Sequence, residues 1–262
     1  MNRWLIIGNG FIAPKHFESI KHVGGEVVAV SDIDDSRMVE GIAFFANYKN
    51  ALDRVDAVSI CTPNDLHAEM ILEAARRGLK ILCEKPITFK MEEVELMRNV
   101  PNLFGVFQLR YLPEINEMRK KAKRAKKAVM KIEMKRSGSY HLTWKGDPKR
   151  TGGLLVNIGA HYFDLLGHLF GYEGFTPVLH KKEETGAAGT LIYRDIDVDW
   201  SIELTEEKPE YQRSLMIDDI KFDLVQKENL HKKVYENFVW GQGTTVKEEE
   251  KILKMIYAIS MG

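Results

Sequence analysis

A glycine-rich turn near the amino terminus constrains the fold more than any other feature of the sequence. Arg3 to Ile7 (RWLII) is a short apolar run typical of a buried strand, and it leads directly into the turn GNGFIA, residues 8–13, and then into a helical pattern. In such a strand–turn–helix unit Gly8 makes the tight turn, Gly10 lets the backbone approach a pyrophosphate, and Ala13 is small where helix meets strand. The sequence therefore predicts a dinucleotide-binding unit with the diphosphate at the helix N-terminus.

A carboxylate follows the second predicted strand. Val27 to Ser31 reads as this strand, and Asp32 comes 22 residues after Gly10, close to the spacing of about 20 expected for the acid that binds the ribose hydroxyls. We expect NAD rather than NADP, because a 2′-phosphate would be repelled by Asp32 and Arg37 lies beyond two more acids. The alternative is that Asp32 only caps an acidic loop.

A lysine follows one of the later predicted strands. Ala57 to Cys61, Lys80 to Cys83 and Leu103 to Phe107 read as short buried strands, and Glu84-Lys85-Pro86 follows the second of them. The proline restricts Lys85 to extended geometry and makes its peptide bond a candidate for the cis isomer. Because open α/β sheets bind ligands at the carboxyl ends of their strands, Lys85 is a candidate functional residue.

The second half of the chain contains an apolar helix pattern with a polar face. Leu154 to Phe170 follows two glycines and predicts one buried helix, on which Asn157, His161 and Asp164 fall at i, i+4 and i+7. The simplest alternative is a satisfied core histidine beside a polar cap. A metal site is the other, because His161, Asp164 and His168 share a face, but no further His/Cys cluster lies nearby and we predict no metal.

Period-two hydrophobicity indicates a sheet around this helix. Val129–Arg136, Gly189–Tyr193, Asp197–Leu204 and Arg213–Ile217 alternate apolar and polar residues. The sequence therefore predicts an α/β chain, with a Rossmann domain over residues 1–109 and an α+β domain with a mostly antiparallel, open-faced sheet over residues 110–262. We expect the open face to carry Val198, Trp200 and Ile202, or their alternates, and to join subunits in a homo-dimer or homo-tetramer.

Composition narrows the class of protein. The 262 residues suffice for two domains, and 38 basic residues balance 38 acidic ones, which argues against a nucleic-acid binder. We see no apolar run of about 20 residues and no signal-peptide pattern, so we expect no membrane association. Cys61 and Cys83 end strand-like runs, which favours buried thiols in a reducing cytoplasm over a disulfide.

Taken in order, these motifs resemble those of the glucose–fructose oxidoreductase / inositol dehydrogenase (Gfo/Idh/MocA) family. The resemblance is carried by residues 8–13, Asp32, CTPNDLH (61–67), EKP (84–86) and GGLLVNIGAHYFD (152–164). It implies that the first domain binds NAD(P) and that Lys85 and His161 flank the sugar carbon that exchanges a hydride with the nicotinamide.

One branch of the family is more similar still, the bacterial UDP-N-acetylglucosaminuronate 3-dehydrogenases of surface-polysaccharide synthesis. NGFIAPKH (9–16), QLRY (108–111) and SYHLTWKGDPKRTGG (139–153) fit this branch. The resemblance implies substrate contacts from Lys85, Arg110, Tyr140, Asn157 and His161. It implies cofactor contacts from Gly8, Gly10, Phe11, Ile12, Asp32, Ile33, Cys61, Thr62, Pro63, Asn64, His67, Glu84, Lys85, Gln108, Trp144 and Lys145.

The chemistry of the two proposed catalytic groups agrees with the resemblance. Oxidation of a hydroxyl needs a base that titrates near neutrality, which His161 provides, while Lys85 can stabilise the developing alkoxide. We expect NAD-dependent oxidation of the 3-hydroxyl of a UDP-linked N-acetylated uronic acid. The alternatives are a family oxidoreductase for a free sugar, a polyol or another cyclic alcohol, and a non-catalytic NAD-binding protein.

Overall fold

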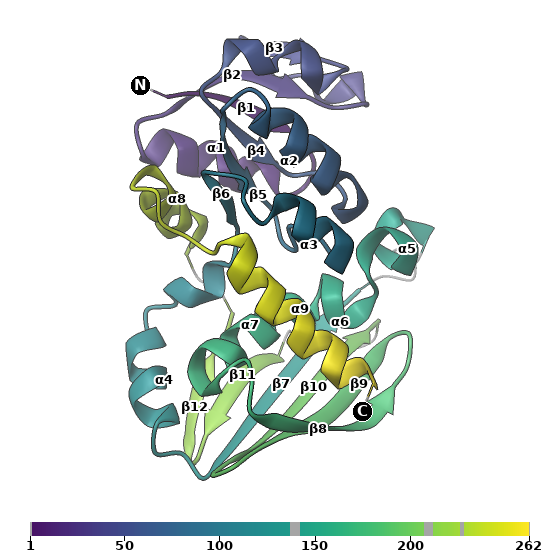
Figure 1. Ribbon diagram of the computed structural model, residues 1–262, viewed down its shortest axis with the longest axis vertical. Coiled ribbons are helices and arrows are strands. Elements are labelled where there is room, and N and C mark those ends of the chain that lie inside the picture. Colours follow the sequence, from purple (N-terminus) through teal and green to yellow (C-terminus); the bar gives the residue numbers. More distant parts are fainter. Residues whose placement is uncertain (1, 137–141, 207–211, 226–227, 262) are drawn as a thin grey trace. The chain divides into compact units, whose positions relative to one another are not determined.

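The computed structural model describes residues 2–136, 142–206, 212–225 and 228–261 (Figure 1). The chain divides into two units, Met1–Gln108 with Asn229–Glu250, and Leu109–Glu228 with Lys251–Gly262. Residues 229–250 thus pack with the first unit although they follow the second in sequence. Among the described residues, no helix combines the length and apolarity needed to cross a bilayer.

The first unit is built on a six-stranded sheet in which all strand pairs are parallel. The strand order is β3-β2-β1-β4-β5-β6, which confirms the predicted Rossmann sheet. Its strands are β1 (Arg3–Ile7), β2 (Glu26–Ser31), β3 (Ala43–Phe45), β4 (Ala57–Ile60), β5 (Lys80–Cys83) and β6 (Leu103–Gly105). Its helices are α1 (Ala13–His22), α2 (His67–Ala75), α3 (Met91–Met97) and α8 (His231–Val239).

The central strands of this sheet, β1, β4 and β5, are covered on both faces. Trp4, Leu5 and Ile6 of β1 are fully buried, as expected for a parallel sheet between helices. Helices α1 and α8, more than 200 residues apart in sequence, lie side by side (Figure 1). The Tyr235 ring of α8 packs at a tilt against Trp4, with 5.2 Å between the ring centroids. The returning segment therefore completes the hydrophobic core of the first unit.

The second unit contains a six-stranded sheet that is mostly antiparallel, as predicted. The strand order is β12-β11-β7-β10-β9-β8, and among the described strands only the pair β7–β10 is parallel. The strands are β7 (Lys127–Lys135), β8 (Phe175–Lys182), β9 (Gly186–Tyr193), β10 (Asp197–Thr205), β11 (Gln212–Ile217) and β12 (Ile220–Asp223). The helices are α4 (Ile115–Ala122), α5 (Pro148–Thr151), α6 (Leu154–Asn157) and α7 (Gly159–Phe170), with the later part of α9 (Val246–Met261).

Of the two alternating sets of residues on β10, the one that contains Val198, Trp200 and Ile202 lies on the covered face of this sheet and not on the open face. Val198, Trp200 and Ile202 are buried, and the Trp200 ring meets Phe163 of α7 edge-on with 5.1 Å between centroids. The apolar alternates of β10 form the core because α7 covers that face. These three residues are therefore not available for the predicted subunit interface. The homo-oligomer itself stays a prediction.

The predicted helix over residues 154–170 is two helices. Helix α6 ends at Asn157 and α7 begins at Gly159, so the i, i+4, i+7 spacing does not run along one continuous helix. Gly159 allows the close packing after the break, because a Cβ there would lie 2.8 Å from the Phe163 ring. The sequence patterns did not predict strands β8 and β12 or helix α8.

We expect Gly8→Ala to destabilise the protein more than Gly24→Ala. Both glycines have positive φ, +90° and +73°, but a Cβ on Gly8 would lie 2.8 Å from the Cys61 carbonyl oxygen, whereas Gly24 has open space. The left-handed backbone alone costs about 1–2 kcal/mol, and the steric clash adds to it only at Gly8. Urea unfolding of both variants measures the difference, and an equal loss of stability would contradict the close approach.

Candidate functional site

Asp32, at the end of β2, is the centre of a hydrogen-bonded loop. Its carboxylate accepts the backbone N–H of Asn9 at 2.8 Å and that of Asp34 at 3.0 Å. Arg37 donates to the same carboxylate at 3.1 Å. The expectation that no arginine lies next to Asp32 is therefore wrong, because a short 3-10 turn at residues 35–37 folds Arg37 back toward it.

The glycine turn lies against the end of β4, at the point where the strand order reverses. Strands β1 and β4 are neighbours, and Gly8 donates its N–H to the Ser31 carbonyl while facing the Cys61 carbonyl. A Cβ on Gly10 would meet only the Arg37 guanidinium, at 3.7 Å. The turn therefore leaves its backbone accessible at the topological switch point, which is where dinucleotides bind in this fold.

Three side chains of this unit suit a bound nucleotide. Phe11 and Ile33 are 88% and 98% exposed, although burying such apolar side chains is favourable. The Oε1 atom of Gln108 is buried and has no hydrogen-bond partner in the part of the chain that the structure describes, a state that a ligand amide would relieve. These features fit the predicted NAD site.

Two of the predicted cofactor contacts have their polar atoms engaged by the protein itself. The buried imidazole of His67 lies 2.8 Å from the Pro86 carbonyl and 2.9 Å from the Thr62 carbonyl. The Glu84 carboxylate is bound by two histidines. Both side chains therefore shape the loops that carry Thr62, Pro63 and Asn64 on one side and Lys85 on the other.

Lys85 is the second residue after β5 and is half-buried. The Lys85–Pro86 peptide bond is cis, as the sequence suggested. Parallel strands end at the same edge of a sheet, so Lys85 lies at the edge that also carries Asp32 and the glycine turn.

In the second unit, two predicted site residues line one cleft. The cleft is open to solvent and is lined in part by Lys145, Thr151, Asn157, Glu184 and Leu204. Asn157 donates its side-chain amide to the Lys145 carbonyl at 3.3 Å, and the Lys145 ammonium lies 5.9 Å from the centre of the Trp144 ring. Partial burial, aided by the charge of Arg136, lowers the pKa of Lys145. The cleft therefore presents a cation and an amide, and the Trp144 ring lies beside the cation.

Arg110 does not present a free guanidinium for a substrate anion. Its Nη2 and Nε atoms donate to Asp164 at 2.7 and 2.9 Å, and Nη2 also donates to the Tyr172 hydroxyl at 3.1 Å. Asp164 is fully buried and accepts the Tyr172 hydroxyl at 2.8 Å. The pair ties the segment after β6 to α7, so Asp164 is a structural residue, and its oxygens are not available for a metal shared with His161 and His168.

Two predicted substrate residues, His161 and Tyr140, remain to be placed. His161 lies in the first turn of α7 and is half-buried, and Tyr140 lies outside the described residues. Sequence reasoning missed Glu184 and Leu204 of the cleft, because neither belongs to a motif. It also missed His16 and His231, whose shared contact with Glu84 joins positions 68 and 147 residues away.

Comparisons with protein families match both halves of the chain. Residues 2–100 match a model described as "Oxidoreductase family, NAD-binding Rossmann fold", and residues 124–191 match one described as "Oxidoreductase family, C-terminal alpha/beta domain". Curated relatives include glucose-6-phosphate 3-dehydrogenase of Bacillus subtilis and inositol 2-dehydrogenase 2 of Saccharopolyspora erythraea, 27% and 26% identical over 69% and 70% of this chain. The chain spans 57% and 58% of the length of these relatives.

Two solved structures are similar over nearly the whole chain. The WlbA (WbpB) dehydrogenase from Thermus thermophilus in complex with NAD and alpha-ketoglutarate is 30% identical, with a TM-score of 0.86 over 99% of this chain and 94% of that one. The same enzyme in complex with NAD and UDP-GlcNAcA gives 29% identity and a TM-score of 0.85 over 100% and 94%.

We expect Arg110→Ala to destabilise the second unit by about 3–5 kcal/mol, because it leaves the buried Asp164 charge unpaired. Lys181→Ala, which removes an exposed ion pair with Glu183, is the matched control and should cost about 1 kcal/mol or less. Thermal unfolding of both variants measures this. An Arg110→Ala protein that keeps its stability but loses substrate affinity would restore the role that the sequence suggested.

Proposed function

Because the chain belongs to the Gfo/Idh/MocA oxidoreductase family, we propose that it is an NAD-dependent dehydrogenase that oxidises the 3-hydroxyl of UDP-linked N-acetylglucosaminuronic acid (UDP-GlcNAcA). The observation that carries the proposal is the whole-chain similarity to the Thermus thermophilus enzyme that was crystallised with NAD and UDP-GlcNAcA. The second candidate is a dehydrogenase for inositol or a free sugar phosphate, which the curated relatives favour by name.

In the proposed reaction, the C–H bond at the hydroxyl-bearing carbon breaks as a hydride leaves, and the O–H proton passes to a base. NAD supplies the hydride acceptor when it is bound. We assign the base to His161, because histidine is the side chain whose ordinary pKa lies near neutrality. Lys85 stabilises the alkoxide that develops on the substrate oxygen, and its placement after β5 supports this role.

The cleft in the second unit supports a polar, anionic substrate. The Lys145 ammonium is a point charge suited to a carboxylate or a diphosphate, and the amide of Asn157 can both donate and accept. A neutral polyol such as inositol could accept hydrogen bonds from the ammonium, but only an anionic substrate would add a charge–charge attraction. Lys145 therefore supports a substrate with an anionic group, although the Glu184 carboxylate also lines the cleft.

We expect the protein to reduce NAD with UDP-GlcNAcA and to be much slower with UDP-N-acetylglucosamine, free N-acetylglucosaminuronate, glucose 6-phosphate and inositol. Formation of bound NADH in a single turnover should be recorded for each substrate, with a keto acid present in a parallel series to recycle the cofactor. Strong activity on inositol or glucose 6-phosphate with none on UDP-GlcNAcA would establish the second candidate.

We expect Lys85→Met and His161→Ala each to lose about 10²–10⁴-fold in turnover, the usual contribution of general acid–base groups, while NAD binding survives. Lys90→Met is the matched control, because Lys90 lies nearby in sequence but pairs with Glu93 at the start of α3. Stopped-flow turnover and fluorescence titration with NAD separate the two effects. Near-native turnover in either variant would remove that residue from the mechanism.

A further inference from the structure

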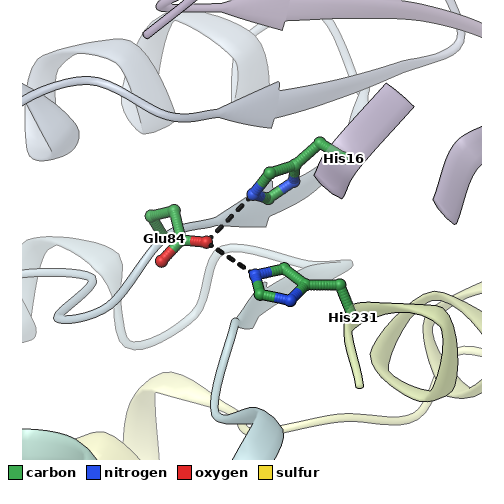
Figure 2. A group of neighbouring side chains, drawn as sticks. All are labelled: His16, Glu84 and His231. Carbon is green, nitrogen blue, oxygen red and sulfur yellow. Dashed lines mark hydrogen bonds and ion pairs between the residues drawn. The ribbon is translucent and has the colours of Figure 1, made fainter. Parts of the chain in front are cut away.

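A carboxylate immediately before Lys85 joins three parts of the first unit. Oε1 of Glu84, just after β5, lies 2.9 Å from Nε2 of His16 and 3.2 Å from Nε2 of His231 (Figure 2). His16 comes from α1 and His231 opens α8, and both imidazoles are fully buried. We call these three residues the Glu84 clamp.

The chemistry of the Glu84 clamp fixes its protons. A carboxylate only accepts, so each Nε2 carries a hydrogen. The Nδ1 atom of His16 lies 2.8 Å from the hydroxyls of both Tyr235 and Ser59, so one of them donates to it. Burial alone would raise the pKa of Glu84, but the hydrogen bonds from the two imidazoles hold it well below its usual range. Glu84 is therefore a buried anion stabilised by two donors.

The other oxygen of this anion reaches the backbone of Lys85. Oε2 of Glu84 accepts the Lys85 N–H at 3.3 Å, while the Glu84 N–H donates to the Ile60 carbonyl at 2.9 Å. Because a carboxylate is planar, two donors on Oε1 also set the direction of Oε2. A change at His231 is therefore transmitted to the Lys85 peptide through one rigid group.

We propose that His16 and His231 are positioning residues that act through Glu84 to fix the backbone of Lys85. The catalytic part of this proposal rests on the role of Lys85 given above. Residues 229–250 follow the second unit in sequence but pack with the first. Through His231, this segment thereby helps to fix the backbone position of Lys85. A precisely held catalytic group contributes to rate through orientation and not through cofactor affinity.

A bound divalent cation is the competing explanation of the Glu84 clamp. Its three side chains offer one ligand atom each, all within 4.8 Å of one another. The hydrogen bonds favour the clamp, because a metal would have to displace the protons from both Nε2 atoms and the buried site would need further ligands. Elemental analysis of the purified protein decides between them: we expect no stoichiometric metal, and one equivalent of zinc or another divalent metal would overturn the proposal.

The test compares His231→Leu, which removes the donor, with His231→Gln, whose amide N–H replaces it. Hydrogen exchange at single-residue resolution reports on the Lys85 amide, and the Glu84 amide serves as the internal reference because it bonds to Ile60. We expect His231→Leu to speed exchange at Lys85 by about 10-fold or more with little change at Glu84, and His231→Gln to restore the native rate. Equal acceleration at both amides, or none at Lys85, would overturn the proposal.

Turnover gives the catalytic readout. His231→Leu should lower kcat by about 10-fold or more with KM for NAD within about 2-fold, and His231→Gln should recover most of it. A Leu variant that exchanges faster at Lys85 but keeps native kcat overturns the positioning role. The exchange experiment uses no substrate, so a wild-type protein inactive on UDP-GlcNAcA would count against the proposed function alone.

Two further variants complete the design. His22→Gln is the matched control, because His22 and Glu236 join the same two helices through an ion pair at 2.8 Å on the surface, and it should change neither readout. If His231→Leu does not fold, Glu84→Gln tests the same bond, since an amide NH₂ facing Lys85 cannot accept its N–H. Glu84→Gln should then speed exchange at Lys85 selectively, and native exchange there would overturn the proposal.

Discussion

The parallel pairing of β1 with β4 is the constraint on which the first unit depends. It brings the turn after β1 so close to the end of β4 that only glycine fits at position 8, where a Cβ would lie 2.8 Å from the Cys61 carbonyl. That contact marks the point where the strand order reverses. The ends of β2 and β5, and with them Asp32 and Lys85, are placed at the same edge by the parallel register.

Three carboxylates illustrate how differently this protein uses a buried or half-buried acid. Asp32 accepts two backbone N–H groups and an exposed arginine, so it orders a loop at the cofactor edge. Asp164 is enclosed by Arg110 and Tyr172 and holds its own unit together. Glu84 accepts hydrogen bonds from two imidazoles on one oxygen and from the Lys85 backbone N–H on the other. The donor set around each acid, not the acid itself, decides its role.

The proposed function assigns different parts of the chemistry to the two units. The first carries the glycine turn, Asp32 and Lys85, which suit a nucleotide and an alkoxide. The second carries His161 and the cleft of Lys145 and Asn157, which suit proton transfer and an anionic substrate.

The sequence by itself determined the features that depend on local pattern. The strand ends, the glycine turn, Asp32, the Lys85–Pro86 bond and the mostly antiparallel second sheet follow from periodicity and from residues with restricted backbones. Tertiary structure decided which face of β10 is covered, because period-two alternation marks two faces without saying which one a helix will occupy. It also decided which side chains pair. Arg37 binds Asp32, Arg110 binds Asp164, and His231 contacts Glu84, from which it is 147 residues away in sequence. No local pattern encodes these contacts, since each depends on where two distant segments meet after the cores have formed.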